Sequence, residues 1–162
     1  MYQRVKSKDC PVSLDELKQW NYIESDLFDD KLKTCLNSAI ASAESHANII
    51  IWKSTFTLAL DHIEYEIPVF ACPVSSISIA VDGSSLAASL YQFDGNVILV
   101  DGSVRGSGMT VTIEAGIDPV DDDIKAAILL IASELFRNPT DSVKQLPTAS
   151  QLLLQPFRRA NI

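Results

Sequence analysis

The sequence predicts an α+β fold: a single domain that consists of a helical bundle of about four helices with an inserted small antiparallel β-sheet. Apolar residues recur about every 3.6 positions in the first and last parts of the chain, which is the helical period. Between these parts they alternate with polar residues, and Asp-Gly pairs interrupt the alternation, as expected for strands joined by tight turns. With 162 residues, 47% of them hydrophobic, the chain is long enough for one buried core.

Helices are predicted over residues of about 13–50. Ser13 and Glu16 have the spacing of a capping box, so the segment "VSLDELKQW" predicts a short helix. A longer helix, from about Asp26 to Ile50, is predicted because its apolar residues form one stripe. The members of this stripe are Phe28, Leu32, Cys35, Leu36, Ala39, Ile40, Ala43 and Ala47.

The sheet is predicted over residues of about 54–117. The segments "STFTLALDH", "SSISIAVDG" and "GMTVTIEAGI" each alternate apolar with polar residues, and a further strand is expected over 96–100. Asp-Gly turns at this spacing indicate about four or five antiparallel strands.

Two more helices are predicted over residues of about 119–160. "DPVDDDIKAAILLIASELFRN" returns to the helical period, with Pro119 and three aspartates, 121–123, suited to a helix start. Asn138-Pro139 should end that helix. Pro147 could begin a last helix, in which three apolar residues would share a face: Leu152, Leu153 and Phe157.

The formal net charge of −8 is unevenly distributed. Basic residues lie near the two ends: Arg4, Lys6, Lys8, Arg158 and Arg159. The segment 54–104 contains six acidic residues and neither Lys nor Arg. Such a segment repels phosphate, so we expect no sequence-specific DNA binding there. Basic ends and an acidic body could instead form contacts between copies.

No pattern for catalysis is present. His46 and His62 lie on different predicted elements, and the cysteines, Cys10, Cys35 and Cys72, form no C-x-x-C pair. We therefore predict no catalytic residues, no metal site, no cofactor and no enzymatic activity. No apolar run in the chain is long enough to span a membrane. The N-terminal segment is basic but has no apolar region of the kind found in a secretory signal.

The order of several motifs resembles that of the head–tail connector family of tailed bacteriophages, the adaptor or head-completion proteins. These motifs are "VSLDELK", "PVSSI", "IEAGI" before "IKAAILL", and the terminal "LL-x-P-F-R" over residues 153–158. The resemblance extends from about Val12 to Arg159. The chain differs from the family pattern in "IEAGI", where an aromatic residue commonly precedes Ala-Gly, and at Asp15-Glu16-Leu17.

The resemblance implies a structural protein of a virion or prophage neck, made in the bacterial host cytoplasm during assembly. Roughly twelve copies would form a ring under the portal protein, connect the DNA-filled head to the tail, and let DNA pass without sequence-specific binding. Other partners would be stopper or tail-completion proteins. The resemblance implies no association with a membrane. The alternatives are a stopper or tail-completion protein of the same neck, or a DNA-packaging accessory protein.

The resemblance also implies that the C-terminal segment contacts the portal or a neighbouring subunit. The expected contact residues are Leu152, Leu153, Leu154, Pro156, Phe157, Arg158 and Arg159. In the alternative interpretation, Leu153 and Phe157 pack on the chain's own helices and the arginines are solvated. If the segment is a docking element, deleting the chain from Leu152 onward should leave a folded monomer that no longer assembles.

Overall fold

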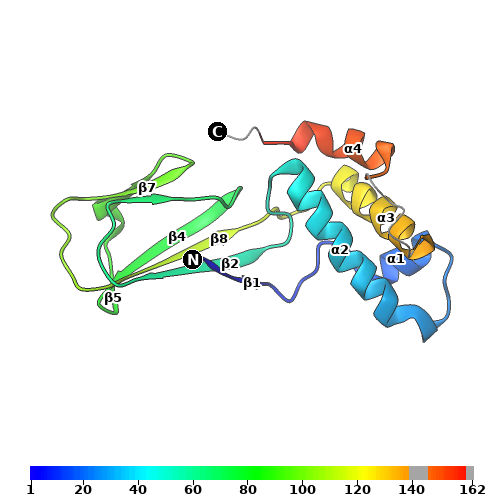
Figure 1. Cartoon of the computed structure of the whole chain (residues 1–162), viewed down its shortest axis with the longest axis horizontal. Helices are drawn as coiled ribbons and strands as arrows, with labels where there is room; N and C mark the ends of the chain where they lie inside the picture. Colours follow the sequence, from blue (N-terminus) through cyan, green and yellow to red (C-terminus); the bar gives the residue numbers. More distant parts are fainter. Residues whose placement is uncertain (139–145, 160–162) are drawn as a thin grey trace. The chain divides into compact units, whose positions relative to one another are not determined.

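The computed structural model describes residues 1–138 and 146–159. The chain forms two compact units, each built from two stretches of sequence. The strand unit contains Met1–Lys8 and Lys53–Gly116, and the helical unit contains Asp9–Trp52 and Ile117–Ile162 (Figure 1). The α+β class is therefore confirmed. That residues 1–162 act as a single connector-like domain stays a prediction.

The strand unit holds two antiparallel sheets. A five-stranded sheet has the order β1-β2-β8-β4-β5, and a three-stranded sheet has the order β3-β7-β6. The strands are β1 (Gln3–Lys6), β2 (Ser54–Leu60), β3 (Glu66–Pro68), β4 (Val74–Val81), β5 (Ser84–Ser85), β6 (Tyr91–Phe93), β7 (Val97–Val100) and β8 (Met109–Ala115).

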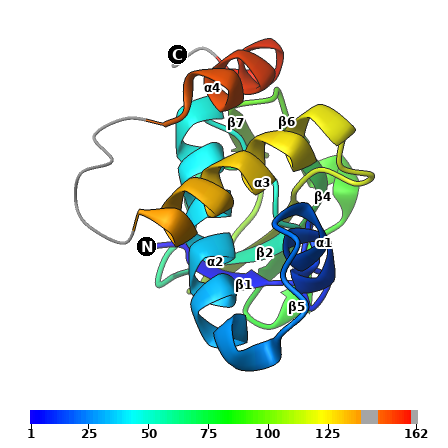
Figure 2. The ribbon, with the colours of Figure 1, turned by 90° about the vertical axis from the view of Figure 1, so that its right-hand side faces the viewer.

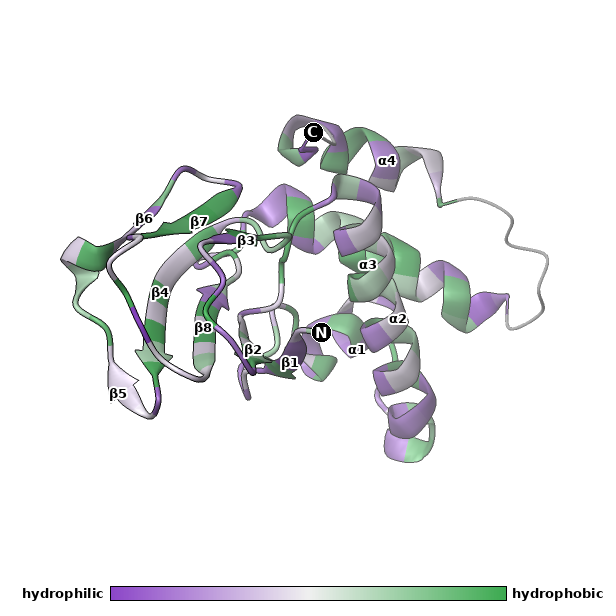
Figure 3. Ribbon diagram, turned by 60° about the vertical axis from the view of Figure 1, so that its left-hand side comes forward, coloured by the Kyte–Doolittle hydropathy of each residue, from purple (hydrophilic) through white to green (hydrophobic). Residues whose placement is uncertain are grey.

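The centre of the larger sheet is β8, which pairs with β2 on one side and β4 on the other. Its side chains alternate strictly: Met109, Val111, Ile113 and Ala115 are buried, and the residues between them are more exposed. Figure 3 shows the hydrophobic bands along β4 and β8 that result. The period-2 pattern in the sequence thus places one face of β8 in a core.

The prediction of one sheet with four or five strands is wrong, because the described residues form eight strands in two sheets. The N-terminal residues supply an edge strand, β1, in register with β2, so strands precede the first helix. A sequence pattern indicates where strands and turns occur, but it does not identify pairing partners that lie far apart in the chain.

The loop before β8 is anchored by Asp82, which follows β4. The Asp82 carboxylate accepts hydrogen bonds from the Ser107 hydroxyl at 2.8 Å, the Ser107 amide at 3.1 Å and the Gly108 amide at 2.9 Å. The loop comes this close because Gly106 has no side chain: a Cβ there would overlap Val81 and lie 2.8 Å from Asp82 Oδ2. The Ser107 hydroxyl, and then the two amides, lower the pKa of Asp82 below its ordinary value.

We expect the Asp82→Asn variant to unfold at a lower temperature than the native chain at neutral pH. Because the folded state lowers the pKa of Asp82, its carboxylate stabilises the fold fully only above the unfolded-state pKa of about 3.9. As the pH falls from there through the lower folded-state pKa, the difference between the two proteins should shrink. Thermal unfolding followed by circular dichroism from pH 7 to pH ~2.5 measures this. Asp61→Asn, at an exposed position, is the control and should change the melting temperature little.

The helical unit contains four α-helices among its described residues, as predicted, while their arrangement as a bundle stays a prediction. They are α1 (Leu14–Trp20), α2 (Asp29–Ala47), α3 (Asp122–Arg137) and α4 (Thr148–Leu154). Short 3-10 turns precede α2 (Asp26–Phe28) and follow α4 (Gln155–Phe157). Helix α3 packs against α2 and α4, and Figure 2 shows α4 near one end of α2.

Local sequence signals explain most of these helix boundaries. The capping box is confirmed: the Glu16 amide donates to Ser13 Oγ, and the Ser13 amide donates to the Glu16 carboxylate. The apolar stripe of α2 is buried as predicted except for Phe28, which lies before the helix and is 44% exposed. The placement of Pro119 in the first turn of a helix is wrong, because α3 begins three residues later, at Asp122.

One buried carboxylate fixes the chain after α2. Glu44 is only 8% exposed, and its Oε1 atom accepts hydrogen bonds from the amides of Ile51 and Trp52, both at 2.9 Å. These contacts hold the segment that leaves α2 against the helix itself. A buried carboxyl group is tolerated here because backbone donors hydrogen-bond to it.

Candidate interaction surfaces

The C-terminal segment divides between the core and the surface. Leu154 is fully buried in the apolar core of the helical unit, and Leu153 and Phe157 pack partly buried against that core. The prediction that Leu154 contacts a partner is therefore wrong, because the side chain is enclosed by its own chain. For Leu153 and Phe157 the structure supports the packing alternative over their use as free anchors.

The other predicted contact residues lie on the surface. Leu152 is 63% exposed, and Pro156 and Arg158 are exposed. Arg159 is half-buried, and its backbone amide donates a hydrogen bond of 2.9 Å to the carbonyl of Ala47 at the end of α2. The segment is thus fixed to the helical unit, while Leu152 and Arg158 remain available for intermolecular contact.

A second surface, which the sequence analysis missed, surrounds the connection between α1 and α2. Four large apolar side chains are exposed there: Trp20 (45%), Tyr22 (95%), Leu27 (82%) and Phe28 (44%). A hollow of about 560 Å³ adjoins them and is lined by Glu16, Gln19, Trp20, Tyr22 and Leu129. The sequence signal for this surface was the position of Trp20 and Tyr22. Both lie at the end of the predicted short helix, and neither belongs to the apolar stripe that predicts the core.

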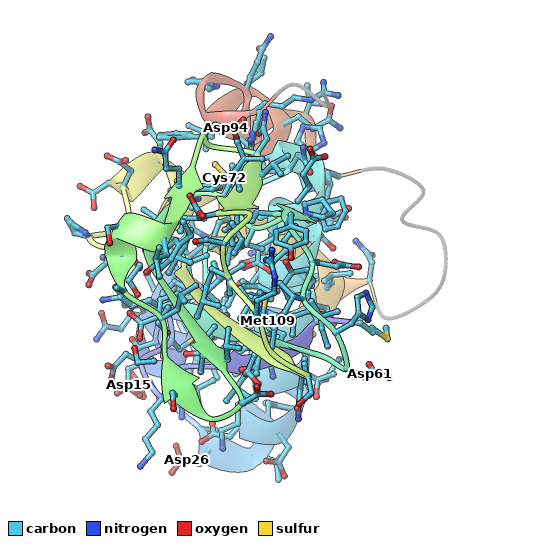
Figure 4. The ribbon with its side chains drawn as sticks, turned by 90° about the vertical axis from the view of Figure 1, so that its left-hand side faces the viewer. Asp15, Asp26, Asp61, Cys72, Asp94 and Met109 are labelled. Atoms are coloured by element: carbon cyan, nitrogen blue, oxygen red, sulfur yellow. The ribbon has the colours of Figure 1, made fainter. Side chains whose placement is uncertain are left out.

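The acidic residues of the strand unit serve local structure. Besides Asp82, Asp94 accepts hydrogen bonds from the amides of Asn96 and Val97, and Asp101 accepts one from the amide of Ser103. Figure 4 shows Asp61 and Asp94 at the margin of this unit, whereas Met109 lies in its interior. These carboxylates stabilise turns and also leave negative charge at the surface of the unit.

No group of three or more His, Cys, Asp or Glu side chains in residues 1–138 and 146–159 is arranged to hold a metal ion. The distance from His62 Nε2 to Glu64 Oε1 is 3.6 Å, and both side chains are substantially exposed. Burial raises the pKa of the Cys35 thiol, which disfavours the reactive thiolate. Within the same residues, no helix has both the length and the apolar character needed to cross a membrane.

Comparison with solved structures identifies the class of fold. The chain superposes on a chain in the neck of an empty gene transfer agent (GTA) particle, computed with C6 symmetry, with a TM-score of 0.74 and 18% identity, over 100% of this chain and 97% of that one. A chain of the native GTA virion gives 0.71 and 15% identity, over 98% and 96%. A chain of the native GTA neck, computed with C12 symmetry, gives 0.70 and 18% identity, over 100% and 97%.

No protein-family model matches the chain, and no curated protein shows significant similarity to it. The structural likeness, which covers nearly the whole of both chains, shows that this chain has the fold of phage-like neck components. This result is consistent with the head–tail connector family that the sequence resembles.

Proposed function

We propose that this chain is a head–tail connector: a structural, non-catalytic protein of a phage-like neck that assembles as a ring under the portal. The observation that carries the proposal is the superposition over 100% of the chain on a neck chain, at a TM-score of 0.74. The matched necks were computed with C6 and C12 symmetry, which supports assembly of this chain as a ring of roughly twelve copies.

In this role the ring joins the DNA-filled head to the tail and lets the genome pass through its opening. Residues 54–104 carry negative charge without Lys or Arg, so this part of the chain repels the phosphate backbone and does not retain DNA. The ring forms in the bacterial host cytoplasm during assembly and then resides in the virion neck. The same distribution of charge suits a stopper or tail-completion protein. The binding partner, portal or tail protein, distinguishes these roles from that of the connector.

We assign the contact with the portal protein to the exposed part of the C-terminal segment, Leu152, Pro156 and Arg158. Leu152 offers an apolar side chain that is 63% exposed, and the Arg158 guanidinium can pair with a carboxylate of the partner. Leu154 is excluded from this set because it is fully buried.

We expect Leu152→Glu to weaken binding to the portal by about tenfold or more while leaving thermal stability nearly unchanged. The substitution places a charge where an apolar side chain would be desolvated by the partner, but it removes little packing within the chain. Co-purification of tagged portal with each variant measures the binding. Phe70→Glu, at an apolar side chain that is 79% exposed in the strand unit and belongs to neither proposed contact surface, is the control for portal binding and should retain it.

The proposed function is tested by electron microscopy of the chain mixed with the portal protein encoded in the same genome region. A ring of this chain stacked on the portal supports the proposal. Binding to a tail protein but not to the portal would instead assign the stopper or tail-completion role. A chain that binds neither and forms no ring would contradict a neck function.

A further inference from the structure

Tyr22 ends α1 in a conformation that its residue type does not favour. The helix closes with the Tyr22 amide donating to the Gln19 carbonyl and the Ile23 amide donating to the Lys18 carbonyl, which is the Schellman arrangement. The residue in the left-handed position is Tyr22, with φ 56°. Glycine is favoured at this position because it has no Cβ. The tyrosine ring is 95% exposed, so burial within the chain does not offset the backbone strain.

The aromatic residues near Tyr22 follow one face of α3. Trp20 and Leu129 line the same hollow, Asn21 Nδ2 donates to Ser133 Oγ at 2.9 Å, and Phe28 packs edge-on against Phe136 with ring centroids 5.9 Å apart. The three α3 positions are spaced i, i+4 and i+7, so they lie on one side of the helix. We call the exposed residues Trp20, Tyr22 and Phe28 the aromatic strip.

Acidic residues outnumber basic ones around the aromatic strip, although Lys31 Nζ lies 4.5 Å from the Phe136 ring centroid and Lys125 lies close enough to Glu16 to help lower the pKa of its carboxyl group. The segment 15–30 contains six acidic residues and a single Lys or Arg, which is Lys18. The Lys18 ammonium is already paired with the Asp26 and Asp29 carboxylates. Glu16 lines the hollow, and the Ser13 amide lowers the pKa of its carboxyl group, which keeps it ionised at neutral pH. A partner for this surface should therefore combine an apolar group with positive charge.

The N-terminal strand of the chain itself has this chemistry. Val5 is 58% exposed on the edge strand β1, and the exposed side chains of Lys6 and Lys8 follow it. A ring requires each subunit to present two different, complementary patches, one to each neighbour. An acidic aromatic patch and a basic apolar patch on one chain meet this requirement.

We propose that the aromatic strip of one subunit binds strand β1 of the next subunit, with Val5 directed at the hollow and Lys8, which lies beyond the end of the strand, facing the acidic rim. This inference rests on the proposed ring function and names the contact that closes the ring. Trp and Tyr are the residues that most often dominate the binding energy of an interface. The strained, exposed Tyr22 is then retained for a contact made only in the assembly.

Photo-crosslinking tests which chain meets the strip. The photoreactive p-benzoylphenylalanine replaces Tyr22 in the full-length protein, both alone at high concentration and bound to the portal. Crosslinked peptides that join position 22 to residues 3–8 of a second copy support the proposal. Crosslinks from position 22 to the portal only, or to no protein, overturn it. The same photoreactive residue in place of Phe70, which is 79% exposed in the strand unit, gives the background.

We expect Tyr22→Gly to weaken association between copies by about tenfold or more without lowering the melting temperature. Glycine removes both the ring contact and the backbone strain, so loss of assembly in a protein of at least native stability cannot result from misfolding. Sedimentation velocity over a concentration series, with and without the portal, measures association, and Phe70→Gly is the control. If Tyr22→Gly assembles as the native chain does, the surface assignment is wrong while the ring function stands; if the native chain forms no ring either, the proposed function itself fails.

Discussion

Replacing Leu154 by alanine should lower the free energy of unfolding of the helical unit by about 2–5 kcal/mol. Leu154 is fully buried, and it belongs to the same core cluster as residues of α1, α2 and α3. Truncation to alanine removes apolar contacts and leaves a cavity, because the surrounding helices relax only partly. Urea denaturation followed by circular dichroism at the helix band measures the change.

The matched control is Leu152→Ala, two residues away on the same helix. Since Leu152 is 63% exposed, its removal should change the free energy of unfolding by no more than about 0.5 kcal/mol. Equal effects of the two substitutions would contradict the packing of α4 described above. A large effect at Leu152 alone would mean that α4 is rotated about its axis.

The burial of Leu154 also reverses one expectation from the sequence. The docking hypothesis predicts that deleting the chain from Leu152 onward leaves a folded monomer, but the deletion removes Leu154 from the core together with the partly buried Leu153 and Phe157. The structure therefore predicts that the truncated protein is destabilised. Docking of the segment is therefore better tested with Leu152→Glu, which preserves the core.

The run of leucines shows why the sequence could not assign this surface. Consecutive residues of a helix point about 100° apart, so Leu152, Leu153 and Leu154 cannot all face one partner. The buried face of α4 includes Ser150, whose hydroxyl donates to the Pro147 carbonyl at 2.7 Å. Because a serine occupies this face, hydrophobicity alone did not identify which leucine turns inward.

Elements with strong local signals were predictable, and those formed by distant pairing were not. The capping box of α1, the stripe of α2 and the alternation of β8 each depend on residues close in sequence. In contrast, β1 pairs with β2, with Gln3 opposite Thr57, and β3 pairs with β7, with Glu66 opposite Leu99. No local pattern encodes such partners, so the number of sheets could not be derived.

The aromatic strip was missed for a related reason. Its exposure depends on how α1 ends, and a left-handed Tyr22 is not expected from residue type. A search for large apolar residues outside the periodic stripe would have selected Trp20 and Tyr22, but it could not have placed them beside Leu129 of α3. The chain fold, which the comparisons with GTA necks support, is what brings these residues together.

Glu44→Ala should be the second most damaging of the substitutions considered, lowering the free energy of unfolding by about 2–4 kcal/mol. The change removes the acceptor for the amides of Ile51 and Trp52, and a buried donor without a partner costs about 1–3 kcal/mol. Ile51 itself is fully buried, so water cannot readily replace the carboxylate at its amide.

Glu44→Gln separates hydrogen bonding from charge at the same position. The glutamine carbonyl oxygen can accept both amide hydrogen bonds with nearly the same shape, so this variant should retain most of the stability that alanine loses. Urea denaturation of the two variants, together with amide hydrogen exchange at Ile51 and Trp52, measures the difference. If Glu44→Gln were as unstable as Glu44→Ala, the negative charge and not the acceptor geometry would hold this segment. If neither variant were destabilised, residues 49–52 would be fixed by packing of Ile49 and Ile51 in the core and not by the carboxylate.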